Sequence, residues 1–303
     1  MSMQKIFYMC IWYFVALCKF FVLVWHNILP FNKVGIYFKI KAENFLFFSP
    51  RVYKKFRLQK EVKQNCTSVR LFTKDMVRIH ASFLKPLDGK PVVIFFHGQS
   101  ENITKWQDTF LFLKKSGYGG LFLSYRGHFK SAGRPSEEGI YIDAETAVEY
   151  LKNIGFEEKN IILWGRSLGS APALETALKY NVKSVILESP VYNITQAALS
   201  IFSRYIRLFN IRILKHLIIL LIKNADFIQK FENDKKIQNV KVPILIMHAK
   251  NDEKINFEQA IGLHENNPSS KLVLVENGSH DYADWCYPII EEFFAETEKQ
   301  LCS

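Results

Sequence analysis

Residues 161–169, which read IILWGRSLG, decide how the whole chain is interpreted. A short apolar run leads directly into the pentapeptide G-x-S-x-G, and residues 170–180 follow with apolar side chains at helical spacing. This pattern is typical of a nucleophile elbow, in which a serine sits on a sharp turn between a strand and a helix. It predicts Ser167 as a nucleophile, with Gly165 and Gly169 small because the backbone passes close by. The alternative is a glycine-rich structural turn.

Short apolar runs alternate with helical patterns on both sides of this stretch. The runs lie at 69–72, 77–83, 92–96, 120–124, 161–164, 184–187, 244–247 and 272–275. Such alternation predicts an α/β fold with a mostly parallel eight-stranded sheet that is flanked by helices. The middle runs are continuously apolar, as expected for strands that are buried on both faces. Ligands then gather at the carboxyl ends of the strands.

Two polar residues follow the last two runs in the order that a serine nucleophile requires. Asp252 comes after the run at 244–247, and His280 comes after the run at 272–275. A serine hydroxyl needs a base, and that base is usually a histidine oriented by a carboxylate. The sequence therefore predicts a triad of Ser167, Asp252 and His280. Other residues fit these roles less well. The alternative acids are Glu188, which is the best substitute, Asp281 and Asp284, and the alternative bases are His216, His248 and His264.

An oxyanion hole needs two backbone N–H donors, and the sequence offers one on each of two loops. The residue after the nucleophile, Leu168, supplies the first donor. The run at 92–96 continues into His97-Gly98-Gln99, and Gly98 lets that backbone come close. We expect the N–H of Gln99 to be the second donor and His97 to have a structural role.

Composition limits the class of protein. The chain has 303 residues with 40 Lys+Arg against 29 Asp+Glu, which gives a net charge of +11. A basic excess favours an anionic membrane surface or a nucleic acid. Because there is no zinc-ligand spacing and no long basic run, we expect membrane lipid as a partner and no nucleic acid. The 5 cysteines are scattered and do not predict a disulfide framework.

The N-terminal residues predict a membrane anchor. Residues 6–25 are apolar except for Lys19, and a helix of that length spans the hydrocarbon core. A cleaved signal peptide and a buried core helix are the alternatives. Because basic residues gather after this run, the catalytic domain is expected to be cytoplasmic. The expected domains are an anchor at 1–30, a basic connector at 31–67, and a catalytic domain at 68–303 with a small helical cap inserted at about 190–240.

Together these motifs resemble the α/β-hydrolase superfamily over roughly residues 68 to 300. The stretches SYRGHFKSAG at 124–133 and SEEG at 136–139, with the elbow, resemble membrane-anchored serine hydrolases of the alpha/beta hydrolase domain-containing protein 13 type. Those proteins usually have asparagine at the position of Gln99 and glycine at the positions of Phe129 and Ser170.

The resemblance implies an enzyme that hydrolyses acyl esters or thioesters of a lipid or a lipidated substrate, with no metal and no organic cofactor. A serine peptidase of the same fold and a catalytically silent membrane scaffold stay open as alternatives. The sequence leaves the oligomeric state undecided.

Overall fold

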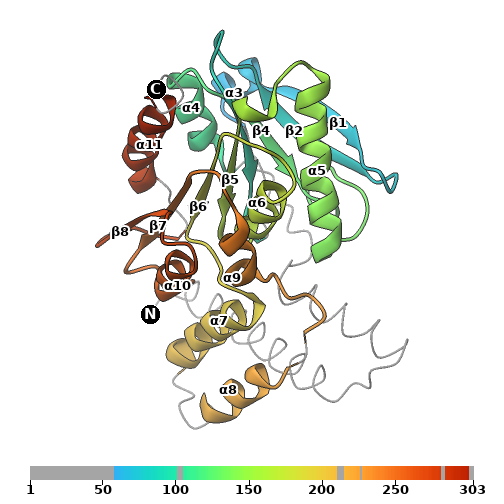
Figure 1. Cartoon of the computed structure of the whole chain (residues 1–303). Coiled ribbons are helices and arrows are strands. Elements are labelled where there is room, and N and C mark those ends of the chain that lie inside the picture. The colour runs from blue at the N-terminus through green and yellow to red at the C-terminus, as the bar shows by residue number, and fades with distance from the viewer. Residues whose placement is uncertain are drawn as a thin grey trace, which may run out of the picture. The chain divides into compact units, whose positions relative to one another are not determined.

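The computed structural model describes residues 58–99, 101, 105–209, 215–225, 227–280 and 284–299 (Figure 1). The strands are β1 (Thr67–Phe72), β2 (Arg78–Leu84), β3 (Val92–Phe96), β4 (Gly119–Ser124), β5 (Ile161–Arg166), β6 (Ser184–Glu188), β7 (Ile244–Ala249) and β8 (Lys271–Val275). The helices are α3 (Lys60–Asn65), α4 (Gln107–Lys115), α5 (Glu137–Asn153), α6 (Ser170–Ala177), α7 (Ile194–Phe209), α8 (Lys215–Lys223), α9 (Asn233–Lys236), α10 (Glu258–Asn266) and α11 (Tyr287–Lys299).

All eight strands form one sheet in the order β1-β2-β4-β3-β5-β6-β7-β8. The pairs β1–β2 and β2–β4 are antiparallel, and every other pair is parallel. The sheet is therefore mostly parallel and eight-stranded, as the alternating pattern predicts. Strands β3, β5, β6, β7 and β8 are parallel neighbours, so their carboxyl ends lie along the same edge of the sheet. The loops that follow them bring together residues that are far apart in sequence.

The core lies on both faces of this sheet, because successive residues of a strand point to opposite faces. Trp164 of β5 packs edge-on against Phe95 of β3, with ring centroids 5.3 Å apart. This aromatic pair belongs to a buried cluster that includes Phe110 of α4 and Phe293 of α11. On the opposite face, a Cβ at Gly165 would lie 2.8 Å from the Cβ of Ala173, so α6 packs directly on β5.

The residues immediately before β1 belong to this body. Helix α3 lies within the segment for which the sequence predicts a connector, and its Val62 is fully buried in the same hydrophobic cluster. Lys114 of α4 also forms an ion pair with Glu61 at 2.7 Å. The first described residues thus pack against the same hydrophobic core as the sheet.

Residues 194–230 belong to a different compact unit from residues 58–193 and 231–299. They contain α7 and α8, which pack on each other. Within the range for which the sequence predicts a small cap, the structure therefore has a helical pair.

The fold prediction needs one correction, which concerns the N-terminal transmembrane helix. From residue 58 onward, none of the described helices is long and apolar enough to cross a membrane. The longest of them, α5, has 17 residues and carries acidic side chains along its length, whereas a span needs about 20 mostly apolar residues. Residues 6–25 lie outside the described part. The fold is an α/β fold with an eight-stranded sheet. The prediction that it includes an N-terminal transmembrane helix is wrong.

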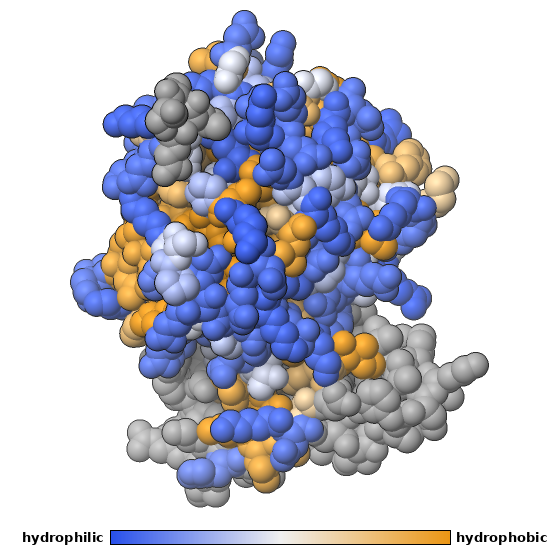
Figure 2. All heavy atoms as spheres, viewed as in Figure 1, coloured by the Kyte–Doolittle hydropathy of each residue, from blue (hydrophilic) through white to orange (hydrophobic). Residues whose placement is uncertain are grey.

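Figure 2 shows the face of the molecule that Figure 1 presents. Hydrophilic residues cover most of the described surface there, and hydrophobic residues emerge in several separate patches. Every residue of β8 is partly exposed, in contrast to the fully buried β7 beside it. Strand β8 is thus an edge strand of the sheet.

Candidate active site

Ser167 follows β5 on a sharp turn that leads into α6. Its backbone has φ 51°, in the left-handed region that is strained for a residue with a side chain. The two flanking glycines explain how the turn closes. A Cβ at Gly165 would lie 2.5 Å from the carbonyl oxygen of Gly169, and a Cβ at Gly169 would overlap the carbonyl oxygen of Phe96. The turn therefore has the strand–elbow–helix geometry that the pentapeptide predicts.

Asp252 and His280 meet at the same edge of the sheet. The Nδ1 atom of His280 lies 2.7 Å from Oδ2 of Asp252, at hydrogen-bond distance. Asp252 follows β7 and His280 follows β8, so the parallel pairing of these neighbouring strands brings the two loops together. Both side chains are almost completely buried. The ring of His280 is thus oriented by a buried carboxylate.

The carboxylate of Asp252 also accepts hydrogen bonds from its own loop. The backbone N–H groups of Lys254 and Ile255 donate to Oδ1 at 2.8 and 2.9 Å. The Nε2 atom of His248 lies 3.2 Å from Oδ2. The sequence does not favour His248 as the base, and in the structure its ring contacts the carboxylate of Asp252. Its position four residues before Asp252, at the end of a buried strand, is the signal that could have shown this.

Burial and these contacts determine the protonation of both residues. Burial alone would raise the pKa of Asp252, but hydrogen bonds from His248 and His280 outweigh it and hold the pKa well below its ordinary value. Burial, together with the positive charge of Arg166, lowers the pKa of His280 although the hydrogen bond to Asp252 opposes this. At neutral pH, Asp252 is therefore ionised and His280 is uncharged, which is the state a general base requires.

The loop after β3 lies against the elbow. A Cβ at Gly98 would lie 3.0 Å from Oε2 of Glu101 and 3.3 Å from the Cβ of Ser167, so a larger residue there would press on both side chains. The loop is held by three bonds: Gly98 N–H donates to Glu101 Oε2 at 2.9 Å, Nδ1 of His97 lies 2.7 Å from the Gly98 carbonyl, and Tyr125 donates to the His97 carbonyl at 3.1 Å. Gln99 follows in the same turn, and Leu168 follows Ser167.

Arg166, the residue before Ser167, connects this loop to the sheet through ion pairs. Its side chain is only 1% exposed, with Nε 2.8 Å from Glu188 and Nη1 3.0 Å from Glu101. The guanidinium also lies over the ring of Trp106, 4.3 Å from its centroid. Burial would raise the pKa of Glu101, but Arg166 and Lys105 lower it, so this carboxylate is ionised. The sequence motif left this position unassigned.

The alternative acids do not occupy the place of Asp252. Glu188, the best substitute, uses one carboxylate oxygen for Arg166 and the other for Nε1 of Trp164 at 3.0 Å. Asp284 lies in a short 3-10 turn before α11, and Asp281 is outside the described residues. Among the described acids, the structure brings Asp252 alone to hydrogen-bond distance of the His280 ring.

Ser170 shows how one departure from the resembling proteins is accommodated. Its hydroxyl donates to the Ser167 carbonyl oxygen at 2.6 Å and accepts from the side chain of Asn233 at 3.1 Å. The backbone N–H of Val191 also points to it at 3.3 Å. A serine in place of glycine thus ties the start of α6 to the loops after β6 and before α9.

Comparison with known proteins places the chain among hydrolases. The family model described as serine aminopeptidase, S33, matches residues 88–240. The chain is 28% identical over 269 residues to an uncharacterized protein of Acanthamoeba polyphaga mimivirus, covering 80% of this chain and 87% of that protein. It is 25% identical to the alpha/beta hydrolase domain-containing protein aho-3 of Caenorhabditis elegans, covering 68% of this chain and 57% of that protein.

Solved structures show the same architecture. An alpha-beta hydrolase from Vibrio vulnificus superposes with a TM-score of 0.68 at 19% sequence identity, covering 88% of this chain and 95% of that one. At this identity the likeness shows the fold. The described sheet is accordingly that of an α/β-hydrolase.

Proposed function

Because this chain belongs to the serine aminopeptidase, S33, family of hydrolases, we propose that it cleaves acyl esters or thioesters through an acyl-enzyme on Ser167. The observation that carries the proposal is the strained Ser167 at the end of β5, on the same sheet edge as the 2.7 Å pair of His280 and Asp252. The fold alone fixes no chemistry, so the roles below rest on these residues.

In the proposed reaction, the Ser167 hydroxyl attacks the substrate carbonyl carbon and His280 takes its proton. Asp252 holds the imidazole in the tautomer that leaves the other ring nitrogen free to accept that proton, and it stabilises the imidazolium that forms. Backbone N–H groups of Leu168 and Gln99 bind the developing oxyanion. His280 then protonates the departing alcohol or thiol, and it later activates the water that hydrolyses the acyl-enzyme.

We place the acyl group on a lipid or a lipidated substrate. The separate unit of residues 194–230 supports this, because α8 reads KHLIILLIK and Leu220 is 57% exposed. This substrate class matches the resemblance to the alpha/beta hydrolase domain-containing protein 13 type. Hydrolysis of p-nitrophenyl esters should therefore become more efficient as the acyl chain lengthens, and a preference for acetate would contradict the substrate class.

Labelling with a fluorophosphonate probe tests the nucleophile. Wild-type protein should be labelled, Ser167→Ala should lose all labelling, and the exposed Ser269→Ala should keep it. Labelling that persists in Ser167→Ala would show that another residue is the nucleophile. A folded wild-type protein that does not react would instead support the silent scaffold.

A serine peptidase is the second candidate, because the description of the matching family favours it. Matched substrates separate the two activities: an acyl p-nitrophenyl ester, the corresponding thioester, and an aminoacyl p-nitroanilide. We expect kcat/KM to be higher for the ester and the thioester. A higher value for the anilide would assign the chain to the peptidases.

A further inference from the structure

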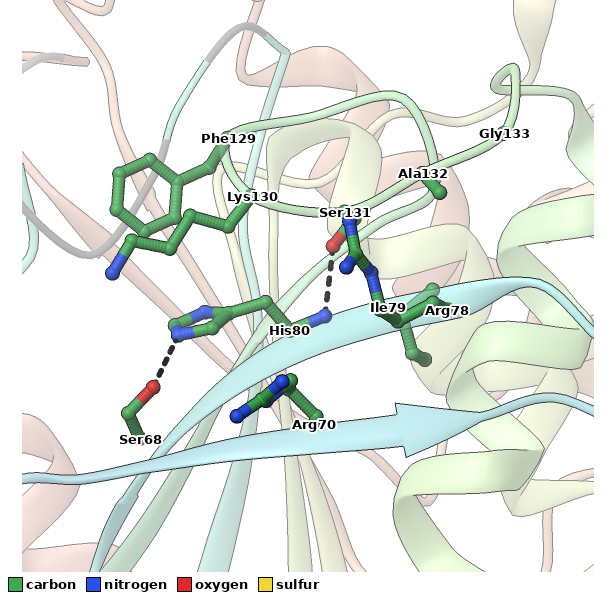
Figure 3. A pocket seen from close by; sticks show the side chains of 10 residues that line it. All are labelled: Ser68, Arg70, Arg78, Ile79, His80, Phe129, Lys130, Ser131, Ala132 and Gly133. Carbon is green, nitrogen blue, oxygen red and sulfur yellow. Dashed lines mark hydrogen bonds between the residues drawn. The ribbon is translucent and has the colours of Figure 1, made fainter.

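A pocket away from Ser167 lies between the β1–β2 hairpin and the loop after β4, and its lining includes three basic residues. It has a volume of about 830 Å³, within the range of about 300–1,000 Å³ that small-molecule sites occupy. Figure 3 shows the loop after β4 passing over the hairpin, with the lining side chains around the space between them. The residues that line it are Ser68, Arg70, Arg78, Ile79, His80, Phe129, Lys130, Ser131, Ala132 and Gly133.

The strand register explains why the cations gather there. Arg70 pairs with His80 across the antiparallel ladder, and Arg78 lies two residues before His80. These three side chains therefore share one face of the hairpin. Lys130 comes from the loop above, and its ammonium lies 5.3 Å from the ring centroid of Phe129. Three basic side chains thus line the same pocket (Figure 3).

In the part of the chain that the structure describes, no carboxylate balances this charge. None of the ten lining residues is acidic. The hairpin contains one acid, Asp75, and Arg126 already binds it at 2.7 and 3.0 Å. Within the described residues, Arg70, Arg78 and Lys130 form no ion pair. Three cations held around a pocket without a counter-charge repel one another, and an anion would relieve that repulsion.

The pocket is built from fixed groups. His80 is 5% exposed, its Nε2 lies 2.9 Å from the Ser68 hydroxyl, and its Nδ1 has no hydrogen-bond partner. Ser131 accepts from the backbone N–H of His80 at 2.9 Å and donates to the Ser124 carbonyl at 2.6 Å, which fixes the overhanging loop. Burial, with Lys130 second, lowers the pKa of His80 to about 4, so the ring is uncharged at neutral pH.

Phe129 supplies the apolar wall, in a backbone conformation that phenylalanine rarely adopts. Its φ is 43°, and its ring packs edge-on against His80 with centroids 5.4 Å apart. The resembling proteins usually have glycine at this position, which adopts such a φ without strain. A strained residue that persists at a concave site is a reason to look for function there.

We propose that this pocket binds a phosphorylated ligand, with Arg70, Arg78 and Lys130 holding the phosphate groups and Phe129 contacting the organic part. Arginine suits phosphate because its planar guanidinium donates two parallel hydrogen bonds. The same chemistry occurs in a soluble phosphate ester and in the headgroup of a phospholipid. The proposal does not depend on the function proposed for Ser167, since none of the lining residues belongs to that site.

Binding of pyrophosphate to the full chain, measured by titration calorimetry, tests the proposal. The double variant Arg70→Glu with Arg78→Glu should bind at least about tenfold more weakly than the wild type, because two charge-assisted contacts become repulsive. The matched control is Lys85→Glu with Lys115→Glu, which makes the same charge change at two exposed residues outside the pocket. Hydrolysis of a short ester and the melting temperature should stay unchanged in both double variants.

The proposal is overturned if pyrophosphate does not bind the wild type, or if both double variants lose binding equally. Cosedimentation with phosphatidylcholine vesicles, with and without phosphatidic acid, then identifies the source of the phosphate. Extra binding to phosphatidic acid that disappears only in the Arg70–Arg78 variant assigns a lipid headgroup. Pocket-dependent binding of pyrophosphate without that extra vesicle binding assigns a soluble phosphate ester.

Discussion

The molecule contains two groups of charged side chains that are organised in opposite ways. Beneath Ser167, the buried Arg166 is matched by Glu188 and Glu101, and each contact is 3.0 Å or shorter. In the hairpin pocket, the exposed Arg70 and Arg78 face no carboxylate among the described residues. The first cluster is complete within the protein, whereas the second lacks its counter-charge.

This difference separates charged side chains that stabilise the fold from those that are available to bind a ligand. A buried ion must be paired, because its desolvation cost is large and its unpaired state is strongly destabilising. An exposed cation has no such requirement, since water solvates it. The buried cluster should therefore respond to mutation through stability and geometry, and the exposed cluster should respond only through ligand binding. The following substitutions test that contrast in order of expected effect.

Arg166→Met should have the largest effect on stability. It leaves the buried carboxylates of Glu188 and Glu101 without their shared cation, which costs about 3–5 kcal/mol in comparable cases. Urea denaturation followed by circular dichroism measures this. A free energy of unfolding within about 0.5 kcal/mol of the wild type would remove the distinction between the two clusters.

Glu101→Gln should act mainly on catalysis. The substitution keeps the shape of the side chain but removes the charge that pairs with Arg166 and that accepts from Gly98 N–H. Because small displacements of an oxyanion loop are costly, we expect kcat for a short ester to fall about tenfold. Glu61→Gln, at a largely exposed ion pair with Lys114, is the control and should leave kcat unchanged. An equal effect of both variants would argue against a role of the loop.

The pH profile should report the buried cluster as well. In the proposed reaction His280 acts in its uncharged form, and burial together with the charge of Arg166 lowers its pKa. Hydrolysis should therefore stay high as the pH falls to about 6.5, the ordinary value for histidine, and should decline only below it. Measurement of kcat/KM against pH gives the midpoint of that decline. A midpoint above about 6.5 would mean that burial and the charge of Arg166 do not lower the pKa of His280.

Arg70→Met should have the smallest effect on the protein itself. The side chain is exposed and unpaired, so the free energy of unfolding should change by less than about 0.5 kcal/mol. Thermal unfolding beside Arg166→Met makes the comparison direct. A destabilisation of more than about 2 kcal/mol would show that Arg70 has a structural contact and is not reserved for a ligand.

The sequence predicts the sheet and the elbow well, because both depend on local patterns. The run at 161–164 and the glycines around Ser167 determine a strand and a turn without reference to distant residues. The positions of Asp252 and His280 follow from one additional rule, that parallel strands end at the same edge.

What the sequence could not show depends on register and on side-chain contacts. Arg166 meets Glu188 because β5 and β6 pair with these two residues opposite each other. Glu101 reaches Arg166 only through the fold of the loop after β3. The left-handed backbone of Phe129 is likewise invisible in a residue type that normally avoids it. The transmembrane helix was inferred from length and hydropathy alone and was corrected, and the cytoplasmic location that depended on it stays a prediction.

The hydrogen bonds of Asp252 have a consequence for movement during turnover. Two backbone N–H groups and His248 satisfy this carboxylate independently of His280. If the imidazole moves during turnover, the two backbone donors to Oδ1 keep their hydrogen bonds, because neither bond involves the ring. The position of the Asp252 carboxylate therefore does not depend on His280 alone.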